Sequence, residues 1–282
     1  MLVGRKVSGV SAKPQTTRRR ILGVRTEPDC QMVFVDTPGV GDAKHELNKL
    51  MNRTAAAAAR EADVIVGVAD VKRSGDLEVA AGLARGRRAP AILVLNKVDT
   101  VPKPSLLPIL ERLTGEGLWA EVVPVSALSN DGVDLVRGLV RARLPEGPVW
   151  FEEEPADSAA PDHGFIQEVI QESLFARLKQ EIPYSCAVQV ETVEVEGGLI
   201  RIEAAILAER ESHKPILVGA GGAMVKAVGT EARQALEKAF GKKVYLSLRV
   251  RVVEDWRNRE SILADLGYAA GDRDRDRGGG VV

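Results

Sequence analysis

Short apolar runs alternate with helix-forming stretches along the first half of this chain, and three of the runs end directly in a polar motif. The runs at 32–35, 91–95 and 122–125 are followed by Asp-Thr-Pro-Gly, Asn-Lys-Val-Asp and Ser-Ala-Leu. Strands separated by helices pair in parallel with both faces covered, and their ligands bind at the carboxyl ends of the strands. The pattern therefore predicts an α/β domain with a parallel sheet and a ligand site along one sheet edge.

The remaining elements of this half follow from the same patterns. Apolar runs predict further strands, and amphipathic or alanine-rich stretches predict helices. The predicted strands cover 21–24 and 63–69, and the predicted helices cover 46–61, 76–87, 104–115 and 133–144.

The first motif has the composition of a phosphate and metal site. A buried strand fixes the carboxylate of Asp36, which can hold Mg²⁺ through water, and Thr37 and Pro38 lead from it to Gly39. Without a Cβ, Gly39 lets its amide approach a terminal phosphate. An ordinary Asp-Thr-Pro-Gly turn is the alternative, so this assignment depends on the motifs downstream.

The second and third motifs have the donors and acceptors that guanine requires. The Asp99 carboxylate can accept both hydrogens from guanine N1 and N2, while the Asn96 amide meets the base edge and the Lys97 stem covers its plane. Adenine lacks this pair of donors. Backbone amides at Ser126 and Ala127 can receive the guanine O6, so the sequence favours a guanine nucleotide over adenine.

Composition excludes several classes of protein. The 282 residues suit two domains, and 45% hydrophobic with 28% charged residues indicates a soluble globular chain without an apolar run of membrane-spanning length. Two distant cysteines exclude a disulfide framework and point to a reducing cytoplasm. The net charge of −1 excludes a globally basic nucleic-acid binder, although a local basic face is compatible with it. The three histidines, His45, His163 and His213, are isolated, and we assign them no role.

The second half changes pattern after a Pro- and Glu-rich linker at 146–163. A helix at 165–180, strands at 187–195 and 199–208, a Gly-Ala-Gly-Gly turn, a helix at 223–240 and a strand at 243–252 predict an RNA-binding KH fold rather than a plain α+β module. The turn comprises Gly219, Ala220, Gly221 and Gly222, which let the backbone approach a phosphate closely, and Lys226 adds charge nearby.

Four regions result from these patterns. They are a nucleotide-binding domain at 1–145, the linker at 146–163, an RNA-binding domain at 164–268 and a disordered tail at 269–282, rich in Asp, Arg and Gly.

The order of these motifs, joined to a GxxG domain, resembles the Era family of GTPases. KPQTTRRRILGV looks like that family's switch loop, EIPYSCAVQVE like the entry to its type II KH domain, and VGAGGAMVKAVGTEAR like its RNA-binding turn. The resemblance implies a P-loop GTPase domain, GTP and GDP as ligands and Mg²⁺ as cofactor. Thr17, or alternatively Thr16, would be the switch threonine that joins Asp36 at the metal. A solvated basic turn is the alternative for this loop.

The family further implies a partner and a location. It predicts binding to the 3′ end of 16S ribosomal RNA and a role in assembling the 30S subunit. It also predicts a monomeric cytoplasmic protein with peripheral contact at the inner face of the cell membrane. Val40 stands where Ras-like enzymes place a water-orienting Gln, so the catalytic residue is left unassigned.

The chain departs from the family pattern in two places. No GxxxxGK[ST] phosphate loop occurs in it, and losing that loop with its strand and first helix should leave a gap in the sheet. We therefore expect translation to start upstream of Met1. The alternative is a nucleotide-free RNA-binding protein with a decayed GTPase domain, whereas a single NKxD argues against a tandem-domain GTPase. The GxxG also lacks the usual basic residue, because Ala220 and Gly221 fill it.

Overall fold

The computed structural model describes residues 1–268 apart from residues 5, 8, 10–16 and 153–160. Thr16, the predicted tail at 269–282 and half of the predicted linker thus lie outside the described residues. The chain divides into two compact units: Met1–Lys6, Leu22–Val35 and Ala55–Glu153 form unit 1, and Val7–Ile21, Asp36–Thr54 and Glu154–Val282 form unit 2. The predicted domains 1–145 and 164–268 remain a prediction, and the observed contacts place two N-terminal segments with the C-terminal residues.

Unit 1 opens with a β-hairpin, because only two residues separate β1 (Ile21–Glu27) from β2 (Cys30–Asp36). Strands β1 and β2 form a two-stranded sheet of their own. Arg141 of α4 (Val133–Arg141) pairs with Glu27 at 3.3 Å and ties the hairpin to the helix. Strand β1 is three residues longer than the strand predicted at 21–24.

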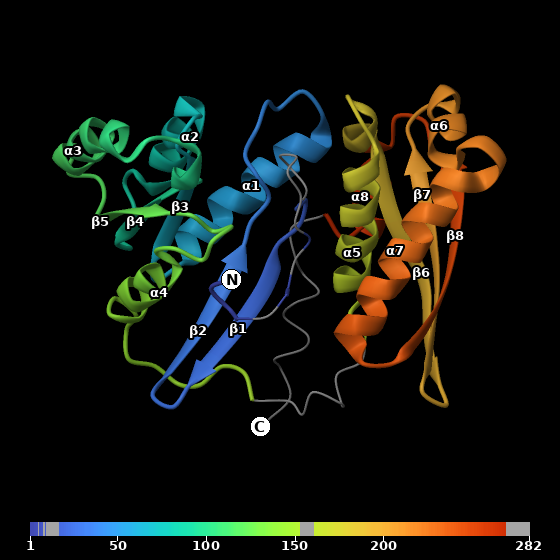
Figure 1. Ribbon diagram of the computed structural model, residues 1–282, viewed down its shortest axis with the longest axis horizontal. Coiled ribbons are helices and arrows are strands. Elements are labelled where there is room, and N and C mark those ends of the chain that lie inside the picture. Colours follow the sequence, from blue (N-terminus) through green and yellow to red (C-terminus); the bar gives the residue numbers. More distant parts are fainter. Residues whose placement is uncertain (5, 8, 10–16, 153–160, 269–282) are drawn as a thin grey trace. The chain divides into compact units, whose positions relative to one another are not determined.

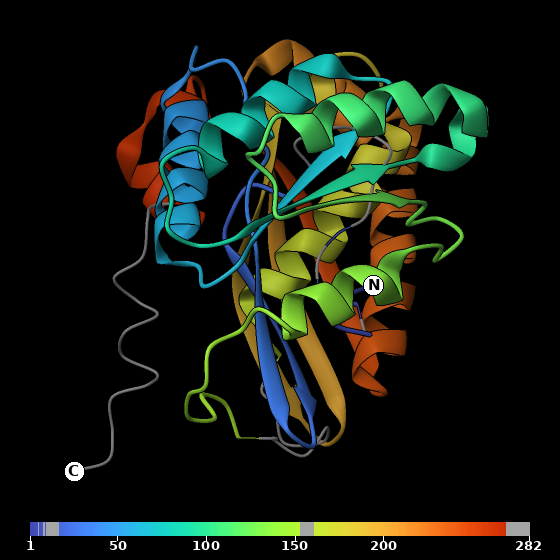
Figure 2. The same cartoon turned by 90° about the vertical axis from the view of Figure 1, so that its left-hand side faces the viewer.

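The parallel sheet of unit 1 consists of β3 (Ile65–Asp70), β4 (Ala91–Asn96) and β5 (Glu121–Val125), in that order. Its register sets Asp70 beside Asn96 and Asn96 beside Val125, so the three carboxyl ends are level. Helices α2 (Ser74–Ala84) and α3 (Leu107–Gly115) pack against one face and α4 against the other (Figures 1 and 2). The predicted parallel sheet covered on both faces is confirmed.

A gap separates β2 from β3. In the part of the chain that the structure describes, β2 pairs only with β1 and β3 only with β4. Val68, in the middle of β3, is 59% exposed, although Met32 of β2 shares one apolar cluster with Ile92 and Val94 of β4. The gap predicted from the missing phosphate-loop strand is therefore present.

Unit 2 contains a three-stranded sheet with β7 (Leu199–Ala208) between β6 (Cys186–Glu196) and β8 (Lys243–Val252). Strand β6 is antiparallel to β7 and β8 is parallel to it. Helices α5 (His163–Arg177) and α7 (Ala223–Phe240) cover one face, and α6 (Lys214–Val218) precedes the glycine turn (Figure 1). This order of elements is the one that the sequence predicted for a KH fold.

The other face of this sheet is covered by segments from both ends of the chain. Leu47 and Met51, from the first half of α1 (Glu46–Glu61), are buried with Ala205 and Leu207 of β7. Trp256 and residues of α8 (Glu260–Asp265) complete this cluster. The beginning of α1 is thus part of the core of unit 2.

None of the helices in the described part of the chain is both long and apolar enough to cross a membrane.

Candidate nucleotide and RNA sites

Thr17 and Asp36, the two predicted metal ligands, lie together in unit 2. The Thr17 hydroxyl donates a hydrogen bond of 3.5 Å to Asp36 Oδ2. Pro38 is buried, whereas Asp36 and Gly39 are exposed. A hydroxyl and a carboxylate are oxygen donors of the kind that Mg²⁺ takes, its remaining positions being filled by water and substrate phosphates. The residues present fit such a site.

Arg18, next to Thr17, is not solvated. Only 3% of it is exposed, and its guanidinium donates to the carbonyls of Cys186 at 2.6 Å and Pro183 at 3.1 Å. The same group lies over the rings of Phe175 and Trp256 at 5.3 and 5.9 Å from the centroids. A solvated basic turn is therefore excluded at Arg18, because this residue anchors the loop in the core of unit 2.

Asn96 joins the second and third motifs in unit 1. Its side-chain oxygen accepts hydrogen bonds from the amide of Lys97 at 2.8 Å and from the amide of Ala127 at 3.1 Å. One side chain therefore fixes the Asn-Lys-Val-Asp turn against the Ser-Ala-Leu turn. This is the arrangement that a pocket for a single base requires, because both turns have to face the same ring.

Lys97 is held by a partner that the sequence did not identify. Its ammonium pairs with Asp70 Oδ2 at 2.8 Å, and its backbone takes the left-handed conformation with φ of 64°. The hydrogen bond from Lys97 lowers the pKa of Asp70 against the effect of its burial. Asp70 is the last residue of β3, and a carboxylate at the end of a neighbouring parallel strand was the available signal.

Asp99 and Ser126 complete the base side. Asp99 is exposed in the short turn Val98–Thr100, where its carboxylate is accessible to a ligand. Ser126 is buried, and its backbone exchanges two hydrogen bonds of 3.0 Å with Asp131. This bridge fixes the loop that carries Ala127.

The glycine turn of unit 2 has the backbone that glycine alone adopts readily. Gly219, Gly221 and Gly222 have φ of 73°, 56° and 82°, and a Cβ on Gly219 would come within 2.7 Å of the Met224 nitrogen. Ala220 is exposed at the middle of the turn. The 18-residue helix α7 begins directly after it without an acidic residue in its first turn. Its positive end therefore favours a phosphate at this turn.

The basic residues of this unit differ in how much charge they offer. Arg233 pairs with Glu237 at 2.9 Å and Arg249 with Glu191 at 2.7 Å, so their charges are partly neutralised. Lys226 is exposed in the second turn of α7, on the same helix end as the glycine turn.

The predicted nucleotide residues are shared between the units. Thr17, Asp36, Thr37, Pro38 and Gly39 belong to unit 2, and Asn96, Lys97, Asp99, Ser126 and Ala127 belong to unit 1. The structure brings residues together within each of these two sets.

Two protein families match parts of the chain. Residues 1–97 match the family described as a 50S ribosome-binding GTPase, and residues 181–257 match the KH domain family. The two matches fall on the halves that carry the nucleotide motifs and the glycine turn.

Whole-chain relatives and solved structures are also similar. The chain is 40% identical to GTPase Era of Geobacter metallireducens over 272 residues, covering 95% of this chain and 91% of that one. It is likewise 40% identical to GTPase Era of Xylella fastidiosa over 271 residues, covering 95% and 90%. A crystal structure of Era with MgGDPNP and nucleotides 1506–1542 of 16S ribosomal RNA superposes with a TM-score of 0.88 at 34% identity, covering 95% and 92%. An Aquifex aeolicus Era variant bound to GDP·AlF4⁻ gives 0.87 at 34% identity, covering 95% and 93%. The chain belongs to the Era GTPase family.

Proposed function

We propose that this protein binds GTP and GDP with Mg²⁺, hydrolyses GTP and binds the 3′ end of 16S ribosomal RNA during assembly of the 30S subunit. The observation that carries the nucleotide part is the side-chain oxygen of Asn96, which holds the turns of Lys97 and Ala127 at one base pocket. Relatives that are similar over 95% of the chain carry the RNA part, because one was solved with MgGDPNP and 16S ribosomal RNA.

Each motif has one task in this proposal. The Asp99 carboxylate accepts hydrogen bonds from guanine N1 and N2, and the Ser126 and Ala127 amides donate hydrogen bonds to O6. Thr17 and Asp36 would hold Mg²⁺, which neutralises phosphate charge when it is bound, and the Gly39 amide would contact the terminal phosphate. Thr37 and Pro38 fix the turn between Asp36 and Gly39. Loss of the terminal phosphate would release Thr17 and Gly39. The loops that carry them would therefore be ordered with GTP bound and relaxed with GDP bound.

The RNA-binding part comprises the turn of Gly219, Ala220, Gly221 and Gly222 with Lys226. Three glycines and the start of α7 offer backbone donors to RNA phosphates, and Lys226 adds charge. We further propose a monomeric cytoplasmic protein that makes peripheral contact with the inner face of the cell membrane.

Titration with fluorescent GDP and XDP tests the nucleotide part. Xanthine carries an oxygen where guanine has its N2 amino group, so Asp99→Asn should lower GDP affinity at least about tenfold and raise XDP affinity. Ser129→Ala, beside the pocket, is the matched control and should leave both affinities within about twofold. Equal GDP affinity in wild type and Asp99→Asn would contradict the guanine assignment.

A second candidate is a nucleotide-free RNA-binding protein, and one observation favours it. The chain contains no GxxxxGK[ST], and the gap between β2 and β3 stands where that loop's strand would pair. Such a protein should bind 16S ribosomal RNA with equal affinity with and without GTP and should not bind fluorescent GDP. Micromolar or tighter GDP binding by this chain would exclude it.

Binding of a 16S 3′-end oligonucleotide tests the glycine turn. Ala220→Asp adds a negative charge without a positive φ at that position and should weaken RNA binding at least about tenfold. Ala120→Asp, an equally exposed site in unit 1, is the charge-matched control. RNA bound equally well by wild type and Ala220→Asp would rule out the turn as the contact.

A further inference from the structure

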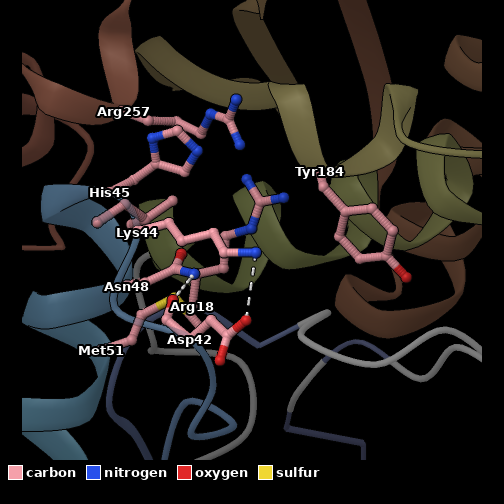
Figure 3. Close-up of a pocket in the computed structure, with 9 residues that line it drawn as sticks. Arg18, Asp42, Lys44, His45, Asn48, Met51, Tyr184 and Arg257 are labelled. Carbon is pink, nitrogen blue, oxygen red and sulfur yellow. Dashed lines mark hydrogen bonds and ion pairs between the residues drawn. The ribbon is translucent and has the colours of Figure 1, made fainter.

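A cavity of about 230 Å³ lies within unit 2 (Figure 3), and none of the predicted nucleotide, metal or RNA residues is among the described residues that line it. Its walls come from the loop before β1, the start of α1 with the residues just before it, and the short turns Ile182–Ser185 and Trp256–Asn258. The residues that line it are Arg18, Asp42, Lys44, His45, Leu47, Asn48, Met51, Tyr184 and Arg257.

Cationic groups dominate these walls. Arg18 is buried, where its guanidinium donates to two carbonyls and lies over two rings. Its charge also acts on the buried carboxyl of Glu168. Arg257 and His45 line the same cavity as Arg18 (Figure 3).

His45 presents a donor or acceptor that the fold leaves unused. Its Nδ1 is buried and has no hydrogen-bond partner among the described residues. A buried polar atom without a partner costs about 1–3 kcal/mol, so a ligand that bonds to it is favoured. His45 also stands directly before α1, a helix of 16 residues, and Leu47 and Asn48 from its start line the cavity, while Glu46 places a carboxylate in the same turn.

The carboxylates near the cavity are already paired. Asp42 pairs with Lys44 at 3.4 Å, and both side chains are at least 77% exposed, so solvent screens them. Glu209 is buried and accepts two hydrogen bonds from Arg257, one of them at 2.9 Å. Glu209 thus neutralises Arg257.

We propose that this cavity binds a phosphate group, held by Arg18, Arg257, His45 and Lys44 at the N-terminus of α1. The ligand chemistry is that of inorganic phosphate or a terminal phosphate monoester, because a compact dianion matches converging cationic donors in a small volume. Thr17 precedes Arg18 in the chain, but neither Thr17 nor Asp36 lines the cavity, and the proposal does not depend on the proposed GTPase activity.

The side chains of the histidines give a direct measurement. The chain has three histidines, and His45→Ala identifies the imidazole signals of His45 in a ¹H–¹⁵N NMR spectrum. Inorganic phosphate, titrated with GDP and Mg²⁺ at saturation, should shift the His45 signals and leave His213, which is bonded to the Ser185 hydroxyl, unchanged. A 5′-phosphorylated trinucleotide, with its unphosphorylated form alongside, separates a terminal phosphate from free phosphate as the source.

Calorimetry with inorganic phosphate completes the test. Lys44→Gln should raise the Kd at least about threefold and His45→Ala at least about fivefold. Lys49→Gln is the matched control, since Lys49 lies on α1, pairs with Glu46 and does not line the cavity. The proposal is overturned if neither phosphate form shifts the His45 signals, or if Lys44→Gln and Lys49→Gln change the Kd equally.

Discussion

Asn96 fixes two peptide groups with one side-chain oxygen, so its role extends beyond a contact with the base. Asn96→Ala removes the acceptor for the Lys97 and Ala127 amides and should lower the free energy of unfolding by about 1–3 kcal/mol. Fluorescent GDP affinity should fall with it, since the two turns lose their common support. Urea unfolding and GDP titration of the same variant measure both effects, and a loss of affinity without a loss of stability would contradict the bridging role.

Glu168 introduces a dependence of stability on pH. Burial raises the pKa of this α5 carboxyl from 4.5 to about 7, with Asp36 adding to the shift and Arg19 and Arg18 opposing it. The folded state therefore prefers the protonated acid. The protonated acid contributes about 3 kcal/mol to the free energy of unfolding relative to the ionised form. This contribution is complete below about pH 4.5 and is lost as the pH rises through about 7.

Glu168→Gln tests this effect, because glutamine stays neutral. The variant should be more stable than wild type at about pH 8, and the difference should shrink towards about pH 5. Urea unfolding at several pH values measures the difference directly. Parallel stability curves for the two proteins would show that Glu168 does not titrate in this range.

At the scale of elements, the first half of α1 belongs to the core of unit 2. Leu47→Ala or Met51→Ala leaves a cavity against β7 and should lower the free energy of unfolding by about 2–5 kcal/mol. Leu128→Ala is the matched control, because Leu128 is 91% exposed and should change stability by less than about 0.5 kcal/mol. Thermal unfolding followed by circular dichroism is sufficient, and equal midpoints for Leu47→Ala and Leu128→Ala would contradict the packing role.

Elements with an uninterrupted local pattern could be predicted from the sequence. The helices Glu46–Glu61 and Ala223–Phe240 and the strands Leu199–Ala208 and Lys243–Val252 begin and end as expected. The alanine run of the first helix, and the apolar periodicity and neighbouring glycines of the other elements, are properties of the segments themselves. The turns after β4 and β5 were predictable for the same reason, because polar motifs end buried strands.

Features that depend on distant contacts could not be predicted. Arg18 reads as one of three arginines in a polar loop, yet its surroundings come from residues far along the chain, including Phe175 and Trp256. Asp70 was missed because only the parallel register of β3 and β4 brings it to Lys97. Neither the burial of Arg18 nor the partner of Lys97 has a signature within its own segment.

At the scale of the whole molecule, unit 2 is built from N-terminal and C-terminal segments together. We therefore expect its C-terminal part to be less stable when it is isolated. A fragment of residues 164–282 lacks Leu47, Met51 and Arg18, which cover Trp256 and the outer face of the sheet. It should unfold at lower urea concentration than the same residues in the full chain and should bind a hydrophobic dye. Trp256 is the single tryptophan of the fragment, and in the full chain Trp119→Phe with Trp150→Phe isolates its fluorescence.

The comparison of the fragment with the full chain can also contradict this prediction. Equal Trp256 unfolding midpoints and no dye binding would show that the N-terminal segments add nothing to this core.

The interleaving of the two units also bears on the order in which the chain folds during synthesis. Arg18, Leu47 and Met51 leave the ribosome long before the KH residues that they contact. Unit 2 therefore cannot close while the chain is half made, and Leu47 and Met51 have to wait with their apolar side chains uncovered. Contacts between residues so distant in sequence form slowly. Synthesis of the KH residues, rather than emergence of the first half of the chain, is then the event that allows the loops of Thr17 and Asp36 to reach their final positions.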